Sequence, residues 1–187
     1  MKKVIGATLV AMALASGVMA DGYIKGGVYT SESDSTSLYF ADGSEIGYEL
    51  AVGGNGHFDS TGGLLLGGEI QYSIQNSDLA TTSTTKNMST VGGQVHLGWT
   101  FFDDLDIYGI GGYYATAMDM TFNDGSYDTV TGAGIRFGAG IDYTIWEHLS
   151  VGAEYTTTTY DLEWASTTAS TKAQTYTNFG GNIKLRF

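Results

Sequence analysis

Phe179-Gly180-Gly181-Asn182-Ile183-Lys184-Leu185-Arg186-Phe187 closes the chain, and its alternation decides the fold. Successive side chains of an extended strand point to opposite faces. One face is therefore apolar, with Phe179, Ile183, Leu185 and Phe187, and the other is polar, with Asn182, Lys184 and Arg186. The segment predicts a β-strand that separates an apolar environment from a polar, cationic one.

Residues 1–20 have the parts of a secretory signal peptide. Lys2 and Lys3 begin it, an apolar stretch follows, and Val18-Met19-Ala20 forms a small-residue cleavage site before Asp21. A membrane anchor is the alternative, but the apolar stretch is short and rich in Ala and Gly for a span of about 20 residues. We therefore expect cleavage after Ala20 and one mature domain, residues 21–187.

Composition and charge argue against several classes of protein. The chain has 8 basic and 20 acidic residues, and loss of the two lysines in residues 1–20 would change the formal net charge from −12 to −14. No basic stripe exists, so a nucleic-acid partner is not expected. The chain has no Cys for a disulfide or thiolate site. It also has no Pro, which suits a chain whose amides nearly all enter a hydrogen-bonded ladder.

The rest of the chain shows the period of strands rather than that of helices. Eight extended segments are predicted, near residues 22–30, 45–56, 63–75, 88–101, 105–117, 128–145, 148–160 and 174–187. Short turns (57–62, 102–104 and 146–147) alternate with longer polar connections (31–44, 76–87, 118–127 and 161–173). Short turns at one end and long loops at the other are typical of transmembrane barrels. The sequence therefore predicts an all-β fold, an eight-stranded antiparallel up-and-down transmembrane β-barrel.

Periodicity alone does not say whether the apolar face points out to lipid or into a soluble, lipocalin-like carrier. The terminal Phe187, the charges repeated on the polar face, and aromatics beside the short turns favour the membrane. These aromatics, expected to form an interfacial girdle, are Tyr23, Trp99, Phe101, Phe102, Tyr143 and Trp146.

The terminal strand resembles the carboxyl-terminal signal strand of bacterial outer-membrane β-barrels. This resemblance implies that the barrel assembly machinery reads Phe179, Ile183, Leu185 and Phe187 during insertion. We accordingly expect a monomer in the outer membrane of a Gram-negative bacterium, in contact with lipid and lipopolysaccharide.

The polar face would line the barrel. Eight strands enclose a bore just wide enough for side chains to fill, and charges in such a space are costly unless they are paired. We therefore predict a salt-bridged core of four basic and four acidic groups rather than a wide aqueous pore, and a narrow or gated conduit stays open. The candidate network is Lys25, Glu49, Glu69, His96, Arg136, Asp142, Glu154 and Lys184, with Gln71, Gln94 and Arg186 on the same face.

Asp103-Asp104-Leu105-Asp106-Ile107-Tyr108, followed by Gly111-Gly112, resembles a turn and strand of the OmpA-type eight-stranded transmembrane domain. Shorter motifs match its other strands in order: Gly47-Tyr48-Glu49-Leu50, His96-Leu97-Gly98-Trp99, Gly140-Ile141-Asp142-Tyr143 and Ala153-Glu154-Tyr155. In that family, luminal ion pairs close a small channel, which implies such a role for Glu49, Asp142 and Glu154. His96 stands where a luminal Lys is expected and Gly152 where an Arg is expected. Lys25, Arg136 or Lys184 would then supply the counter-charge.

Three functions remain open at this stage. Some eight-stranded barrels modify lipid A, but His57 and His148 lie beside turns and His96 faces the lumen, so no nucleophile–base–acid set is evident. We expect no catalytic residue, metal or cofactor. The acidic, Ser/Thr-rich loops suit an adhesin or a recognition protein, and their carboxylates suit divalent cations that bridge to lipopolysaccharide. The leading interpretation is a structural, envelope-integrity protein of the small porin-like class, with a narrow channel for ions or very small solutes left open.

Overall fold

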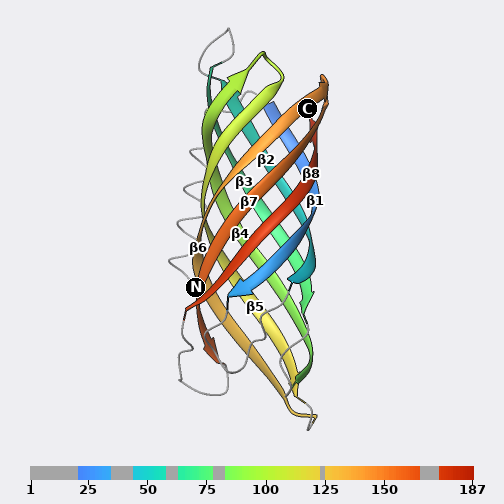
Figure 1. The fold of residues 1–187 in the computed structure, drawn as a ribbon, viewed down its shortest axis with the longest axis vertical. Helices are drawn as coiled ribbons and strands as arrows, with labels where there is room; N and C mark the ends of the chain where they lie inside the picture. Colours follow the sequence, from blue (N-terminus) through green and yellow to red (C-terminus); the bar gives the residue numbers. More distant parts are fainter. Residues whose placement is uncertain (1–20, 35–43, 58–62, 78–82, 123–124, 165–172) are drawn as a thin grey trace.

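The computed structural model describes residues 21–34, 44–57, 63–77, 83–122, 125–164 and 173–187. The expected signal peptide lies outside these residues. The strands are β1 (Asp21–Asp34), β2 (Ser44–His57), β3 (Leu64–Ser77), β4 (Ser83–Phe101), β5 (Leu105–Phe122), β6 (Tyr127–Trp146), β7 (Leu149–Trp164) and β8 (Gln174–Arg186). Each strand pairs antiparallel with the next, and β1 pairs with β8 to close the barrel (Figure 1). The predicted fold class is therefore confirmed. Among the described residues, no helix is long and apolar enough to cross a membrane.

Most strands extend further toward the loop end of the barrel than the sequence predicted. β1 continues to Asp34, β5 to Phe122 and β7 to Trp164, so parts of the expected loops 31–44, 118–127 and 161–173 are strand. The hairpin of β5 and β6 projects furthest at this end (Figure 1). Residues 35–43, 78–82, 123–124 and 165–172, which include the rest of these connections, lie outside the described residues.

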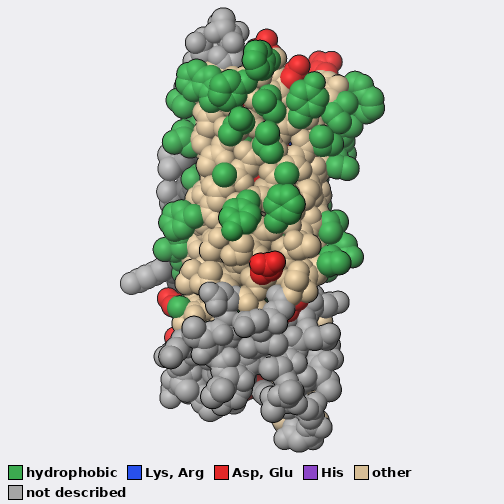
Figure 2. Space-filling view, in the orientation of Figure 1, with side chains coloured by type: hydrophobic (Ala, Val, Ile, Leu, Met, Phe, Trp, Pro, Cys, Tyr) green, Lys and Arg blue, Asp and Glu red, His purple; other side chains and the backbone are tan. Residues whose placement is uncertain are grey.

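The orientation of the side chains is that of a membrane barrel. Outward-facing Leu50, Leu97 and Phe137 are 60%, 59% and 65% exposed, whereas the ammonium-bearing side chains of Lys25 and Lys184 are fully buried in the interior. Figure 2 shows the apolar side chains spread over the outer wall of the barrel. Around the two lysines, the interior is therefore not lined by the apolar faces of the strands, as it would be in a soluble carrier.

The aromatic girdle is confirmed except at one position. Trp99, Phe101, Phe102, Tyr143 and Trp146 are all exposed beside the short turns. Tyr23 was expected among them, but its side chain points into the lumen, where its hydroxyl donates to Glu69 at 2.9 Å. The alternation of β1 explains the correction, because Tyr23 is two residues before the inward-facing Lys25 and so lies on the same face.

Near the loop end, the two faces of the strands exchange polarity, so that the inward side chains are apolar and the outward ones polar. On β5, Met118 and Met120 point inward and Asp119 points outward, and on β7 Leu162 points inward and Asp161 outward. Strands with water outside pack their apolar side chains inside, as soluble barrels do. The resulting apolar layer comprises Met88, Tyr114, Met118, Met120, Val130, Tyr160, Leu162 and Tyr176. The sequence predicted a polar interior. The structure corrects this prediction, because the interior near the loop end is apolar.

The turn between β4 and β5 forces two non-glycine residues into the left-handed region. Phe102 and Asp103 have φ values of 54° and 63°, and Asp104 N donates to Phe101 O at 3.3 Å across the turn. Tight two-residue hairpin turns favour this geometry because it matches the twist of the strands, and Gly adopts it most readily.

Replacing Asp103 with Gly should raise the free energy of unfolding by about 1 kcal/mol, because left-handed backbone costs other residues roughly 1–2 kcal/mol. The urea midpoint of the barrel refolded in lipid measures the change. Asp104→Gly is the control, since Asp104 has no positive φ and its replacement should bring no gain. An equal gain in both variants would contradict the strain assigned to Asp103.

A luminal ion-pair core as the candidate functional site

The candidate network comes from inward positions on seven of the eight strands. β1 supplies Lys25 and β8 supplies Lys184, and the two lysines lie directly opposite each other in the ladder. Like charges in such a position repel unless each ammonium has its own carboxylates. The structure meets this requirement by sending the two side chains to different partners.

Lys25 lies among three carboxylates from three other strands. Its Nζ lies 2.6 Å from Glu69 Oε1, 3.1 Å from Glu154 Oε1 and 3.3 Å from Glu49 Oε1. Glu69 also accepts a hydrogen bond from Gln94 Nε2 at 3.0 Å. This group therefore holds one positive charge against three negative ones, and it depends on the ammonium for its cohesion.

Lys184 forms the second centre. Its Nζ lies 2.5 Å from Asp142 Oδ2 and donates to Tyr108 Oη at 3.3 Å. Tyr108 in turn donates to Glu154 Oε1 at 3.1 Å, which joins this centre to that of Lys25. A buried tyrosine hydroxyl thus connects two ion-pair groups that share no carboxylate.

Arg136 reaches the network through an amide. Its Nη1 donates to Gln71 Oε1 at 2.7 Å, and Gln71 Nε2 donates to Glu49. The guanidinium also donates from Nε to Thr158 at 2.9 Å and lies 3.7 Å from the ring centroid of Tyr114. The structure thus brings all eight candidate residues into one interior, but Arg136 joins it by hydrogen bonding and stacking rather than by the direct ion pair that the sequence suggested.

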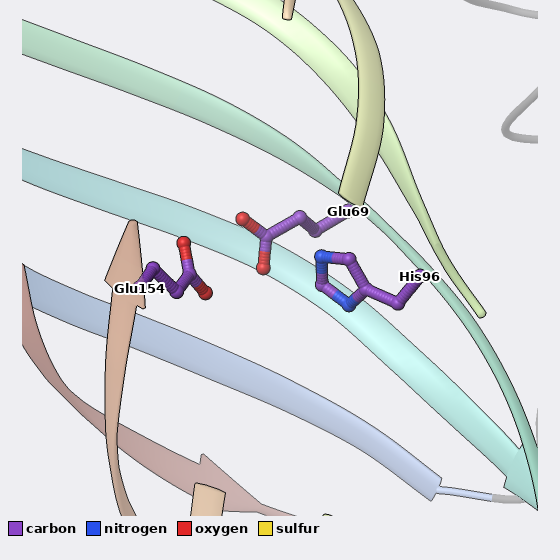
Figure 3. Close-up of side chains that lie close together, drawn as sticks. All are labelled: Glu69, His96 and Glu154. Atoms are coloured by element: carbon purple, nitrogen blue, oxygen red, sulfur yellow. The ribbon is translucent and has the colours of Figure 1, made fainter. Parts of the chain in front are cut away.

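His96 is fully buried next to this group. Its Nε2 lies 3.0 Å from Gln94 Nε2, its ring packs 4.7 Å from that of Tyr108, and its Nδ1 has no hydrogen-bond partner. Glu69, His96 and Glu154 bring one ligand atom each within 4.8 Å of one another, a spacing that a metal ion could bridge (Figure 3).

The geometry around Lys25 does not fit a metal there. The Lys25 ammonium already bonds both Glu69 and Glu154, and Tyr23 and Tyr108 donate to the same two carboxylates. A divalent cation would have to displace a buried positive charge that three carboxylates hold. Lys25 is therefore the cation of this cluster.

Sequence reasoning missed several members of the interior. Asp106 is buried and accepts hydrogen bonds from Thr100 at 2.7 Å and from Arg186 at 3.1 Å, and His57 lies 3.9 Å away. Asp106 adds an acid to the four expected, and Glu45, which accepts a hydrogen bond from the buried Gln75 at 2.7 Å, is another. The position of Asp106 between the outward-facing Leu105 and Ile107 is a signal that could have placed it. The tyrosine hydroxyls have no comparable signal, because aromatics occur on both faces.

The described interior includes a small cavity. It lies beside the Lys25 group, bounded by Glu49, Glu154, Arg136, Asn178 and Asn182 among others. Its volume, measured as the space open to the centre of a water molecule, is about 20 Å³, which is room for one or two waters. Eight strands enclose a bore just wide enough for side chains to fill, and the charged core and the apolar layer both lie inside it.

The four residues of the expected assembly signal all lie on the outer wall. Phe179, Ile183, Leu185 and Phe187 are exposed, and Phe187 exchanges two backbone hydrogen bonds with Gly22, of 2.9 and 3.2 Å. The last residue of the chain thus completes the seam between β1 and β8.

A closed antiparallel barrel with a charged interior, an apolar outer wall and an aromatic girdle matches a known family. Residues 5–187 match the family model described as the outer membrane protein beta-barrel domain. The chain belongs to this family. As an outer membrane protein β-barrel, it is located in the outer membrane of a Gram-negative bacterium.

Solved outer membrane barrels share this fold. Ail, the attachment invasion locus protein of Yersinia pestis, has a TM-score of 0.63 and 10% identity, with 91% of this chain and 100% of that chain covered. Neisserial surface protein A has a TM-score of 0.65 and 12% identity over 89% and 97% of the two chains. A major outer membrane protein of Thermus thermophilus has a TM-score of 0.54 and 13% identity, with 89% of this chain and 99% of that chain covered. No curated protein sequence matches.

Proposed function

We propose that this outer membrane protein β-barrel is a structural, envelope-integrity protein whose lumen is closed to solutes. The observation that carries the proposal is the connected ion-pair core inside the barrel. Lys25, Lys184 and Arg136 are held in one connected network, and the cavity beside it has room for one or two waters. A rigid barrel of this kind contributes to the membrane through its outer wall rather than through transport.

A conductance measurement tests the closed lumen. Purified protein in planar bilayers should give no discrete conductance steps, because an ion would have to cross both the ion-pair core and the apolar layer with little water. Steps in the wild-type barrel would overturn the closed lumen and favour the narrow porin-like channel instead.

The role in the envelope needs a test in cells. A strain without the protein should become more sensitive to detergent and to large antibiotics, and a barrel lacking residues 35–43 and 165–172 should restore resistance. Restoration by the shortened barrel supports a role of the wall, whereas a requirement for the two segments would point to recognition.

A loop-mediated adhesin or recognition protein is the second candidate, favoured by the strands that project beyond the membrane. Their outward faces carry Thr159, Asp161 and Glu163 on β7 and Asp119 on β5. Ail, which shares the fold alone, has been solved with the heparin analogue sucrose octasulfate. The acidic side chains named here would repel such a polyanion, so a partner of this protein would be neutral or cationic. Loss of cell binding after deletion of the two segments, without conductance, would support this candidate.

We propose that the protein is a monomer, that it contacts lipopolysaccharide, and that it has no enzymatic activity. A lipid A-modifying enzyme needs a base near the outer leaflet, but His57 and His148 lie beside the periplasmic turns and His96 is inside the barrel. Unchanged lipid A after overexpression, measured by mass spectrometry, is the expected result.

A further inference from the structure

After residue 20, every methionine of the chain lies in the apolar layer at the loop end of the barrel. The chain has 6 Met, of which Met88, Met118 and Met120 follow residue 20. All three belong to one cluster of buried side chains, with exposed fractions of 5%, 0% and 1%. The exposed apolar positions of the outer wall are filled by Ile, Leu, Val and aromatic residues instead. Because the chain has no Cys, these three residues bring all the sulfur atoms beyond residue 20 into one layer.

The strand register places the three side chains next to one another. Met88 on β4 is directly opposite Met118 on β5, and side chains in such a pair have Cβ atoms about 4.5–5.5 Å apart. Met120 is the next inward residue of β5, about 7 Å along the strand from Met118. It lies diagonal to Met88, at a spacing of about 7–8 Å that long side chains can bridge. Met has three rotatable bonds, so the three thioethers can converge between the two strands.

Three converging thioethers have a specific ligand chemistry. Thioether sulfur is soft and uncharged, and it selects Cu(I) over the hard cations Mg²⁺ and Ca²⁺, which prefer oxygen. Among the described residues, the apolar cluster contains no carboxylate and no imidazole. A hard divalent cation therefore finds no ligand of its preferred kind in this cluster, whereas a soft cation finds three.

The surroundings of the three methionines favour a monovalent ion. The charged residues paired with Met120, Asp128 on β6 and Lys86 on β4, cancel in formal charge, so the charge of a bound ion would be poorly compensated. Burying such a charge costs less for one positive charge than for two. The rings of Tyr160 and Tyr176, which belong to the same cluster and pack edge to face at 5.9 Å, add the attraction of aromatic faces for a cation.

We propose that Met88, Met118 and Met120 form a binding site for a soft monovalent cation, Cu(I) or its analogue Ag(I), in the apolar layer of the barrel. The three thioethers coordinate the ion. The site is separate from the ion-pair core, because Thr90 and Thr116, which share a hydrogen bond of 3.2 Å, occupy the next inward positions of β4 and β5. It goes beyond the structural role and does not depend on whether the lumen conducts.

NMR of the methionine methyl groups tests the site directly. The wild-type barrel in lipid nanodiscs, with isotope-labelled Met methyls, is titrated with silver nitrate in chloride-free buffer. The signals of Met88, Met118 and Met120 should shift together and saturate at a single equivalent of Ag⁺. Each methyl is bonded to the sulfur, so Ag⁺ bound at the exposed His57 or His148 does not produce this result. Mg²⁺ and Zn²⁺ should leave the three signals in place. Signals that do not respond to Ag⁺, or that respond equally to Zn²⁺, would overturn the proposal.

Conservative variants identify the ligands. Met88→Leu and Met118→Leu each remove one thioether and keep an apolar side chain of similar volume. Each should weaken Ag⁺ binding at least about tenfold, since even the loss of a residue that only supports a metal ligand costs roughly 10–100-fold in affinity. Leu162→Ile is the matched control: it alters the same layer without removing sulfur and should keep the wild-type affinity. Wild-type affinity in Met118→Leu would show that this sulfur is not a ligand. Should a variant fail to fold, the wild-type titration decides.

Discussion

Replacing Lys25 with Met should lower the free energy of unfolding by about 3–5 kcal/mol, more than any other single luminal substitution. The reason is that Lys25 alone neutralises the cluster of Glu49, Glu69 and Glu154. Without the ammonium, three carboxylates would face one another in a buried space. The measurement is the urea midpoint of the barrel refolded into lipid vesicles, followed by the loss of heat-modifiable migration on a gel.

The cost should depend on the orphaned charges rather than on the lost volume of the side chain. Met keeps the apolar stem of Lys25, and adding Glu69→Gln and Glu154→Gln to Lys25→Met should restore most of the lost stability. Glu154→Ala should cost less, a few kcal/mol, because Lys25 keeps Glu49 and Glu69. Glu163→Gln, on the exposed outer face, is the control and should change little. An unchanged midpoint in Lys25→Met or Glu154→Ala would contradict the network.

Phe187→Ala should reduce the amount of folded protein in the outer membrane at least about tenfold, a larger effect than its loss of burial predicts. Burying a Phe side chain contributes at most about 3 kcal/mol, and Phe187 is 74% exposed on the lipid side. Its ring packs over Gly22 at the β1–β8 seam, which any apolar residue could cover in part. The expected defect therefore reflects recognition of the terminal strand during assembly.

Phe137→Ala is the matched control for this experiment. Phe137 is 65% exposed on the outer wall in the middle of β6, so its truncation removes a similar lipid contact from a strand that carries no assembly signal. Both variants should show similar urea midpoints when refolded in vitro, but only Phe187→Ala should accumulate unassembled in the periplasm. Normal outer-membrane levels of Phe187→Ala would show that Phe187 is not read as a signal.

Alternation along each strand was enough to predict the barrel, because in lipid every backbone amide must be paired and the outward face must be apolar. It placed Lys25, Glu154 and Lys184 inside and Phe179, Ile183 and Phe187 outside, and short turns at one end set the order of the strands. The same alternation contains two further signals, for the inward orientation of Tyr23 and for the apolar layer near the loop end. Tyr23 shares the face of Lys25, and the exchange of polarity between the two faces at Met118-Asp119-Met120 indicates the apolar layer inside β5.

Only the tertiary structure decided which charges pair. Lys25 and Lys184 face each other across the β1–β8 seam, yet one turns to Glu69 and the other to Asp142. That choice depends on strand register, barrel closure and side-chain conformation, which join residues more than 40 positions apart in the sequence. Period 2 determines the face of a side chain, and packing determines its partner.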